Sequence, residues 1–262
     1  MRVVSLYRYP VKGLSPERLE RVRLERGAYF PADRLFAIEN GPSGFEPAAP
    51  RHQPKIKFLM LMRNAALARL HTRYDDATQV LSVSGEAGSV AADLSTAAGR
   101  LALEAFVRRV LPRELRGAPK VLTAPDGFRF TDSRRGFVSL INLASVRAVA
   151  EMVGRPVDPL RFRGNVMVEG LEPWAELDLV GAEFASASGL RLKITKRIER
   201  CAATNVDPQT GERDMDIPRT LLQRLGHPDC GIYAEVLASG ELRPDDRLEF
   251  LPDAQVRLPL GD

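Results

Sequence analysis

The sequence is poor in the residues that build disulfide frameworks, histidine metal centres and base-stacking surfaces. It has two cysteines, three histidines and one tryptophan, and aromatic residues make up 6% of its 262 residues. Two cysteines do not form a disulfide framework, which favours a reducing compartment, and we expect a cytoplasmic protein. The few aromatic residues do not alternate with basic ones, so we expect no nucleic-acid partner.

Long apolar runs are also missing. No stretch approaches the ~20 apolar residues of a membrane span. The segment Met1–Pro10 is charged at Arg2 and Arg8 and has no long apolar core. We therefore expect neither a signal peptide nor a membrane partner.

Three common functional signatures are absent. The sequence has no GxxxxGK(S/T) phosphate loop, no GxGxxG after a strand and no HExxH. His52, His71 and His227 lie far apart and show no ligand spacing. A cysteine–histidine nucleophilic pair would therefore need a partner that is distant in sequence.

The rest of the composition is typical of a globular protein. Hydrophobic residues make up 44%, charged residues make up 27%, and the net charge of +4 permits binding of anionic ligands. Many short strand patterns and few helical ones predict a mainly β fold with some α (α+β). A linker at 113–120 divides the chain into predicted domains 1–115 and 116–262.

Local patterns predict several elements. We expect a strand at 2–9, a helix at 96–111 capped by Ser95, a helix at 143–153 closed by Gly154, and a final hairpin from 232–237 and 247–251. The Pro- and Gly-rich segment 40–57 is typical of a long surface loop. Its basic residues Arg51, Lys55 and Lys57 could contact an acidic partner, although a solvated loop is the simpler interpretation.

The stretch Lys196–Gly211, KRIERCAATNVDPQTG, concentrates the reactive side chains. Lys196, Arg197 and Arg200 lie within five residues of Cys201. Nearby cations favour the thiolate, the form that attacks electrophiles and binds metals, so Cys201 is a candidate nucleophile or metal ligand. The following residues, Asp207–Gly211, are typical of a tight turn.

This stretch also carries a specific resemblance. RCAATNVDPQTG resembles the signature of the MOSC family, the C-terminal domain of molybdenum cofactor sulfurases. Four other segments are similar to family motifs in the same order along the chain: Tyr9–Gly13 (YPVKG), Asp33–Phe36 (DRLF), Ser139–Asn142 (SLIN) with Ser145, and Phe162–Asn165 (FRGN). The resemblance therefore spans nearly the whole chain.

The resemblance implies a fold and a cofactor. The fold is an N-terminal β-barrel domain followed by a β-rich MOSC domain. The cofactor is molybdenum held by a pterin dithiolene with a terminal phosphate. It implies that Cys201 is both the metal ligand and the catalytic residue, and a soft thiolate suits such a metal. The cofactor-binding residues that it implies are Lys12, Arg34, Ser145, Arg163, Asn165, Arg200 and Thr204.

The family includes the mitochondrial amidoxime-reducing component, so the resemblance implies reduction of small N-hydroxylated substrates. Some bacterial relatives add a four-cysteine iron–sulfur domain. No cysteine follows Cys230 here, so we expect electrons from a separate donor protein. For an acid–base group Asp132 and Asp207 are the candidates. The alternative is a cofactor carrier, or a sulfur-handling module in which Cys201 holds a persulfide, without turnover of its own.

Overall fold

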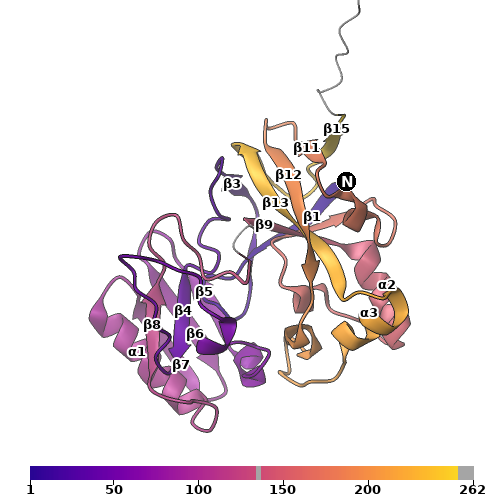
Figure 1. Ribbon diagram of the computed structural model, residues 1–262. Coiled ribbons are helices and arrows are strands. Elements are labelled where there is room, and N and C mark those ends of the chain that lie inside the picture. Colours follow the sequence, from indigo (N-terminus) through magenta and orange to yellow (C-terminus); the bar gives the residue numbers. More distant parts are fainter. Residues whose placement is uncertain (134–136, 253–262) are drawn as a thin grey trace, which may run out of the picture.

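The chain folds into two lobes of mixed α and β structure. The computed structural model describes residues 1–133 and 137–252 and is drawn in Figure 1. Strands predominate, and the described residues contain three α-helices: α1 (Ala97–Val110), α2 (Leu143–Val153) and α3 (Ile217–Leu225). The predicted α+β class is confirmed.

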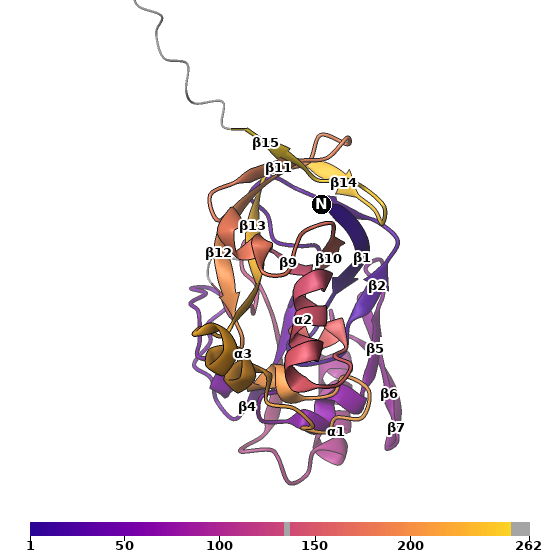
Figure 2. The ribbon, with the colours of Figure 1, turned by 90° about the vertical axis from the view of Figure 1, so that its right-hand side faces the viewer.

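One lobe is built on an eight-stranded sheet that curls around its core (Figure 2). The strand order is β15-β11-β12-β13-β9-β10-β1-β2, with β9 and β10 parallel and all other neighbours antiparallel. The strands are β1 (Arg2–Arg8), β2 (Glu17–Leu19), β9 (Val138–Asn142), β10 (Val166–Glu169), β11 (Glu183–Ala185), β12 (Arg191–Glu199), β13 (Asp229–Ala238) and β15 (Glu249–Leu251).

Both faces of the middle of this sheet are covered. Strand β9 is buried along its whole length, and Leu140 and Ile141, which are neighbours in the chain, belong to two different apolar clusters. Helices α2 and α3 pack on one face through Val149 and Leu221. A strand buried on both faces has no side that contacts water, and its two polar side chains therefore bond inside the protein: Ser139 donates to Asn165, and Asn142 donates to Glu176.

The second lobe combines two small sheets with α1. Phe106 and Val107 of α1 pack into an apolar cluster with both sheets. Strands β4 (Phe36–Asn40) and β8 (Pro119–Thr123) form one sheet, and β5 (His71–Tyr74), β6 (Val80–Gly85) and β7 (Gly88–Asp93) form the other. A further antiparallel pair joins β3 (Val22–Leu24) to β14 (Gly240–Leu242).

The sheets do not divide where the linker was predicted. Strand β1 pairs with β10 in the large sheet, whereas β8, which follows residue 116, pairs with β4. The chain therefore crosses from the lobe of the large sheet into the second lobe after β2 and β3, and it crosses back after β8. The division into domains 1–115 and 116–262 stays a prediction. The strand pairs join residues from both sides of residue 115, so the sheets are not divided at that point.

Several local predictions are confirmed and two are wrong. The strand at the N-terminus and the helices α1 and α2 lie where predicted, and Gly154 closes α2 with φ of 72°. The cap of α1 is Thr96, whose Oγ1 accepts from Gly99 N at 3.0 Å, while Ser95 donates to Asp93. The predicted hairpin near the C-terminus does not form, because β13 pairs with β12 and β9 and β15 pairs with β11.

Within residues 1–133 and 137–252, no helix is long and apolar enough to cross a membrane.

Candidate functional site

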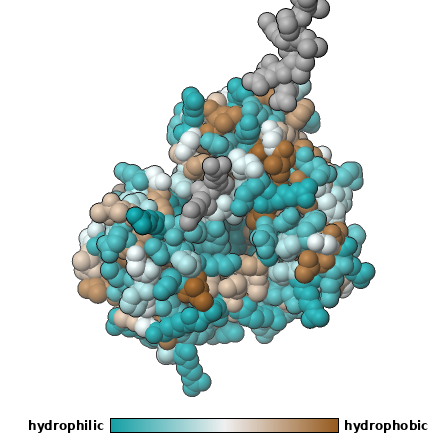
Figure 3. All heavy atoms as spheres, viewed as in Figure 1, coloured by the Kyte–Doolittle hydropathy of each residue, from teal (hydrophilic) through white to brown (hydrophobic). Residues whose placement is uncertain are grey.

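A cavity of about 350 Å³ is lined by residues of both lobes. The space-filling view in Figure 3 shows this face hollowed between the lobes, with mostly hydrophilic side chains around the hollow. Seven of the eight residues that the sequence marked line this cavity: Lys12, Arg34, Arg163, Asn165, Arg200, Cys201 and Thr204. Segments far apart in the chain therefore meet where the motifs predicted a site.

Cys201 lies at the end of β12, where the strand stops and a short 3-10 helix, Ala202–Asn205, begins. Its backbone is extended, with φ of −122°, and its side chain is partly exposed. Its carbonyl accepts from both the backbone N and the Oγ1 of Thr204, each at 3.0 Å. Thr204 thus supports the cysteine through the backbone, which agrees with a structural role for its hydroxyl.

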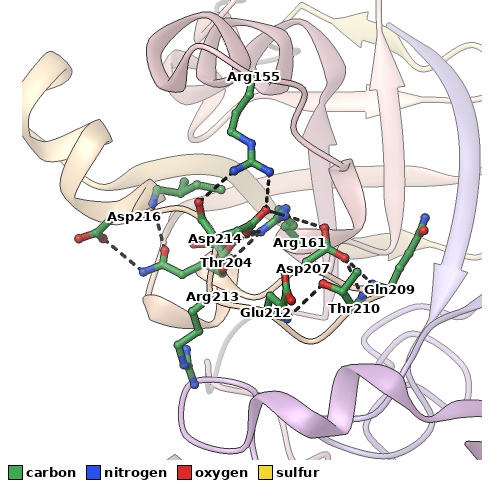
Figure 4. A network of polar contacts seen from close by, with 12 residues as sticks. Arg155, Arg161, Thr204, Asp207, Gln209, Thr210, Glu212, Arg213, Asp214 and Asp216 are labelled. Atoms are coloured by element: carbon green, nitrogen blue, oxygen red, sulfur yellow. Dashed lines mark hydrogen bonds and ion pairs between the residues drawn. The ribbon is translucent and has the colours of Figure 1, made fainter. Parts of the chain in front are cut away.

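The turn after Cys201 is fixed by the polar network in Figure 4. Asp207 Oδ1 accepts from the backbone N of Gln209 and of Thr210, both at 2.9 Å, and Gly211 takes φ of 70°. The other carboxylate oxygen of Asp207 accepts from Arg161 at 2.8 Å. The predicted tight turn is confirmed, and Asp207 is engaged in holding it.

This turn also contacts the opposite lobe. Arg213 donates from Nη2 to the carbonyls of Leu61 and Met62 at 2.9 Å, and Arg69 donates from Nε to Thr210 O at 2.7 Å. The segment that carries the cysteine is therefore held from both sides of the cavity.

Arg200 is a buried cation without a carboxylate partner among the described residues. It is 9% exposed and donates to the carbonyls of Phe162, at 2.7 Å, and of Cys230. Burial lowers the pKa of Arg200, against the pull of neighbouring groups that include Cys201. With three of its five N–H donors bound, the guanidinium retains donors for an anionic ligand.

Arg34 and Arg163 both lie over the ring of Tyr9, with guanidinium carbons 4.4 and 4.2 Å from its centroid. Arg34 pairs with Asp33, but Nη2 of Arg163 is buried without a hydrogen-bond partner among the described residues. Burial and the charge of Arg34 lower the pKa of Arg163 to about 10. Both arginines have positive φ, at 48° and 52°, a costly conformation that recurs at functional sites.

Lys12 is 8% exposed and donates to Phe130 O at 2.9 Å and to the carboxylate of Asp132. Burial lowers the pKa of Lys12. Burial alone would raise the pKa of Asp132, but the charge of Lys12 and its hydrogen bond outweigh this and lower it to about 2. Asp132 is thus held as a carboxylate beside a lysine, which does not suit a proton donor at neutral pH.

Two expected residues turn inward. Ser145 does not line the cavity: it is fully buried, donates to Glu176 Oε2 and accepts from Trp174 N, both at 2.8 Å. The hydroxyl of Ser145 therefore makes structural contacts, and its expected contact with a cofactor stays a prediction. Asn165 lies at the cavity wall, but its amide binds Ser139 and the carbonyl of Tyr7.

Three residues of this site were not marked as cofactor-binding from the sequence. Tyr9 belongs to the YPVKG motif, yet no local signal shows that its ring would lie under two arginines. Arg161 stands beside the FRGN motif and links the cavity wall to the turn after Cys201. Lys55 belongs to the segment expected to be a solvated loop, and it lines the cavity instead.

The donor set fits an anionic group that carries a soft metal. The unpartnered Nη2 of Arg163 is a buried donor, which costs free energy unless a ligand accepts from it. Cys201 supplies the soft sulfur on the same wall. In the described parts of the chain, no cluster of three or more His, Cys, Asp or Glu side chains could hold a metal ion.

Two family models match this chain and identify its family. Residues 128–249 match the MOSC domain and residues 1–107 match the MOSC N-terminal beta barrel domain. The chain belongs to the MOSC family. The resemblance and the β-barrel architecture predicted for the first domain are confirmed, and the family is associated with the molybdenum cofactor.

Two curated relatives are molybdenum cofactor sulfurases, from Caenorhabditis elegans and Caenorhabditis briggsae. Each is 36% identical over 90 residues, which is 32% of this chain and 12% of the sulfurase. Among solved structures, the YUAD protein of Bacillus subtilis covers 94% of this chain and 92% of its own, at 14% identity and a TM-score of 0.44. YiiM of Geobacillus stearothermophilus covers 45% and 55%, at 19% identity and a TM-score of 0.36.

Proposed function

We propose that this MOSC protein binds the molybdenum cofactor through Cys201 and reduces small N-hydroxylated compounds with electrons from a separate donor protein. The observation that carries the proposal is that one cavity wall holds both Cys201 and the buried Nη2 of Arg163, which has no hydrogen-bond partner among the described residues. A soft sulfur and an unsatisfied cationic donor are what a metal with an anionic organic ligand requires.

The residues of this chain have separable tasks. Cys201 would hold the metal, and Arg163, Arg34 and Arg200 would hold the phosphate and the polar edges of the pterin. When bound, the cofactor would supply two-electron redox chemistry. The overall reaction converts N–OH to N–H and releases water, and it consumes two electrons and two protons. The protein would bind the substrate, exclude bulk water and keep Cys201 in place.

A metal analysis tests the proposal. The protein is purified from cells that make the cofactor, and molybdenum and released pterin are measured per chain. We expect about one metal per chain in the wild type and loss of metal in Cys201→Ala. Cys230→Ala is the matched control, because Cys230 is buried and does not line the cavity. Folded wild-type protein without molybdenum would overturn the proposal.

The similarity to molybdenum cofactor sulfurases favours a second candidate, a module that carries cofactor or sulfur without turnover. In that case Cys201 would hold sulfur as a persulfide supplied by a separate desulfurase. Bound cofactor without reduction of hydroxylamine compounds by an artificial electron donor would favour this candidate. A persulfide on Cys201, detected by mass spectrometry before and after thiol reduction, would identify the sulfur-carrying form.

A further inference from the structure

Lys55 brings an ammonium group from the opposite lobe to the cavity that Cys201 lines. It begins a short 3-10 helix, Lys55–Lys57, and its side chain is half-buried in the cavity wall. Cys201, Asp132 and Glu199 line the same cavity, and their charges attract the ammonium of Lys55. The segment 40–57, which the sequence did not connect with the site, thus adds a positive charge to the cavity wall.

Three other cations of the cavity wall already have protein partners, whereas Arg163 keeps a buried Nη2 with none among the described residues and Lys196 lies 5.8 Å from the ring centroid of Tyr233. Lys12 pairs with Asp132, and Arg34 pairs with Asp33. Arg200 donates to two carbonyls. In the described ranges, no carboxylate lies within ion-pair distance of Lys55. An ammonium has three N–H donors, so Lys55 keeps donors for a ligand in the cavity.

We propose that Lys55 is a specificity-determining residue, which binds a negatively charged oxygen of the substrate beside Cys201 and makes the site favour anionic over neutral reactants. This inference rests on the proposed function for its substrate class. A compact ammonium with free donors attracts an oxyanion directly, and attraction is stronger in a partly enclosed site than in bulk water. Small oxyanions and N-hydroxylated compounds with an anionic oxygen are the reactants that this charge selects.

The metal-free protein allows a direct test of this charge. Cys201 is alkylated with anionic iodoacetate and, separately, with neutral iodoacetamide. In both reactions the sulfur forms a bond to carbon and iodide leaves, so the ratio of the two rates cancels the intrinsic reactivity of the thiol. The rates are measured by mass spectrometry on the Cys201 peptide.

We expect the iodoacetate-to-iodoacetamide rate ratio to fall about fivefold in Lys55→Met, as for one nearby charge in a largely aqueous setting. Lys55→Arg should keep the ratio within about twofold, because the charge remains. Lys57→Met is the matched control, since Lys57 lies on the same 3-10 helix, is exposed and does not line the cavity. Its ratio should equal that of the wild type.

Two outcomes overturn the inference. One is an unchanged ratio in a Lys55→Met protein whose melting temperature matches that of the wild type. The other is an equal fall in Lys57→Met, which would trace the effect to general surface charge. Because the test needs no cofactor, a fall in the ratio together with absent molybdenum would refute the proposed function while supporting the charge of Lys55.

Discussion

Arg161 and Asp214 are joined by two parallel hydrogen bonds, Nη1 to Oδ1 at 2.8 Å and Nη2 to Oδ2 at 2.9 Å. The Arg161 side chain is 2% exposed. Nη2 of Arg161 also donates to Asp207, so one guanidinium holds two carboxylates of the segment that follows Cys201 (Figure 4). Bidentate pairs of this kind fix geometry as well as contributing energy.

Replacing this arginine should therefore destabilise the fold. Arg161→Met leaves Asp207 and Asp214 without their buried partner, and we expect a loss of about 3 kcal/mol in the free energy of unfolding. Arg155→Met is the control, because Arg155 contacts the same Asp214 from an exposed position, where a pair is worth about 0 to 1 kcal/mol. Urea unfolding measures both. Equal losses would contradict the central role of Arg161.

Thr204 makes a smaller contribution through the backbone of Cys201. Thr204→Val keeps the shape of the side chain but removes the donor to Cys201 O, and we expect a loss of about 1 kcal/mol. Thr204→Ser keeps the hydroxyl and should recover most of it. If valine and serine cost the same in chemical denaturation, the hydrogen bond is not what stabilises this position.

Gly231 should not tolerate a side chain. Its φ is 83°, and a Cβ would lie 2.7 Å from Leu140 O and 2.8 Å from Nη2 of Arg200. Gly231→Ala should therefore displace Arg200 and lower the melting temperature more than Gly226→Ala. Gly226 has a similar φ of 79°, and no atom of the described residues would lie within 4 Å of its Cβ, so alanine there costs only the left-handed backbone, about 1 to 2 kcal/mol. Similar melting temperatures for the two variants would contradict the close approach.

The pair of Lys12 and Asp132 predicts a pH dependence. Because the pKa of Asp132 is lowered from 3.8 to about 2 in the folded protein, its carboxylate stabilises the fold above pH 3.8, and this stabilisation is lost as the pH falls through about 2. The stability difference between wild type and Asp132→Asn should be present at pH 7 and shrink between pH 4 and 2. With the Asp132 side chain 50% exposed, we expect at most about 1 kcal/mol.

Unfolding by urea at pH 7, 4 and 2.5 measures this difference. Asp126→Asn is the control, since Asp126 is exposed in the same loop and should differ little from the wild type at pH 7. A constant difference in the free energy of unfolding between wild type and Asp132→Asn at all three pH values would exclude a stabilising role of the ionised Asp132 carboxylate.

Helices and strands whose signals lie close together in the sequence could be predicted from it. Helix α2 has an apolar stripe that ends at Gly154, and both signals are local. The predicted hairpin near the C-terminus failed because β13 and β15 bind strands that lie elsewhere in the chain. Strand patterns show that a segment extends, but they do not show which partner it meets.

The candidate site followed the same rule. Lys12, Arg34 and Cys201 could be placed together because family motifs mark them, whereas Ser145, marked by the same reasoning, is fully buried against Glu176. Lys55 lies in a segment rich in proline and glycine with no motif of its own. Its place beside Cys201 depends on how the two lobes pack, and no local pattern encodes that.

The position of β1 has a consequence for synthesis on the ribosome. Arg2 is hydrogen-bonded to Glu169, 167 residues further along the chain, and β1 pairs with β10. At ordinary elongation rates β1 would wait roughly 10 to 30 s for its partner. During that interval the edge of β1 that later pairs with β10 is open to other chains, so we expect the nascent chain to be prone to aggregation until β10 is made.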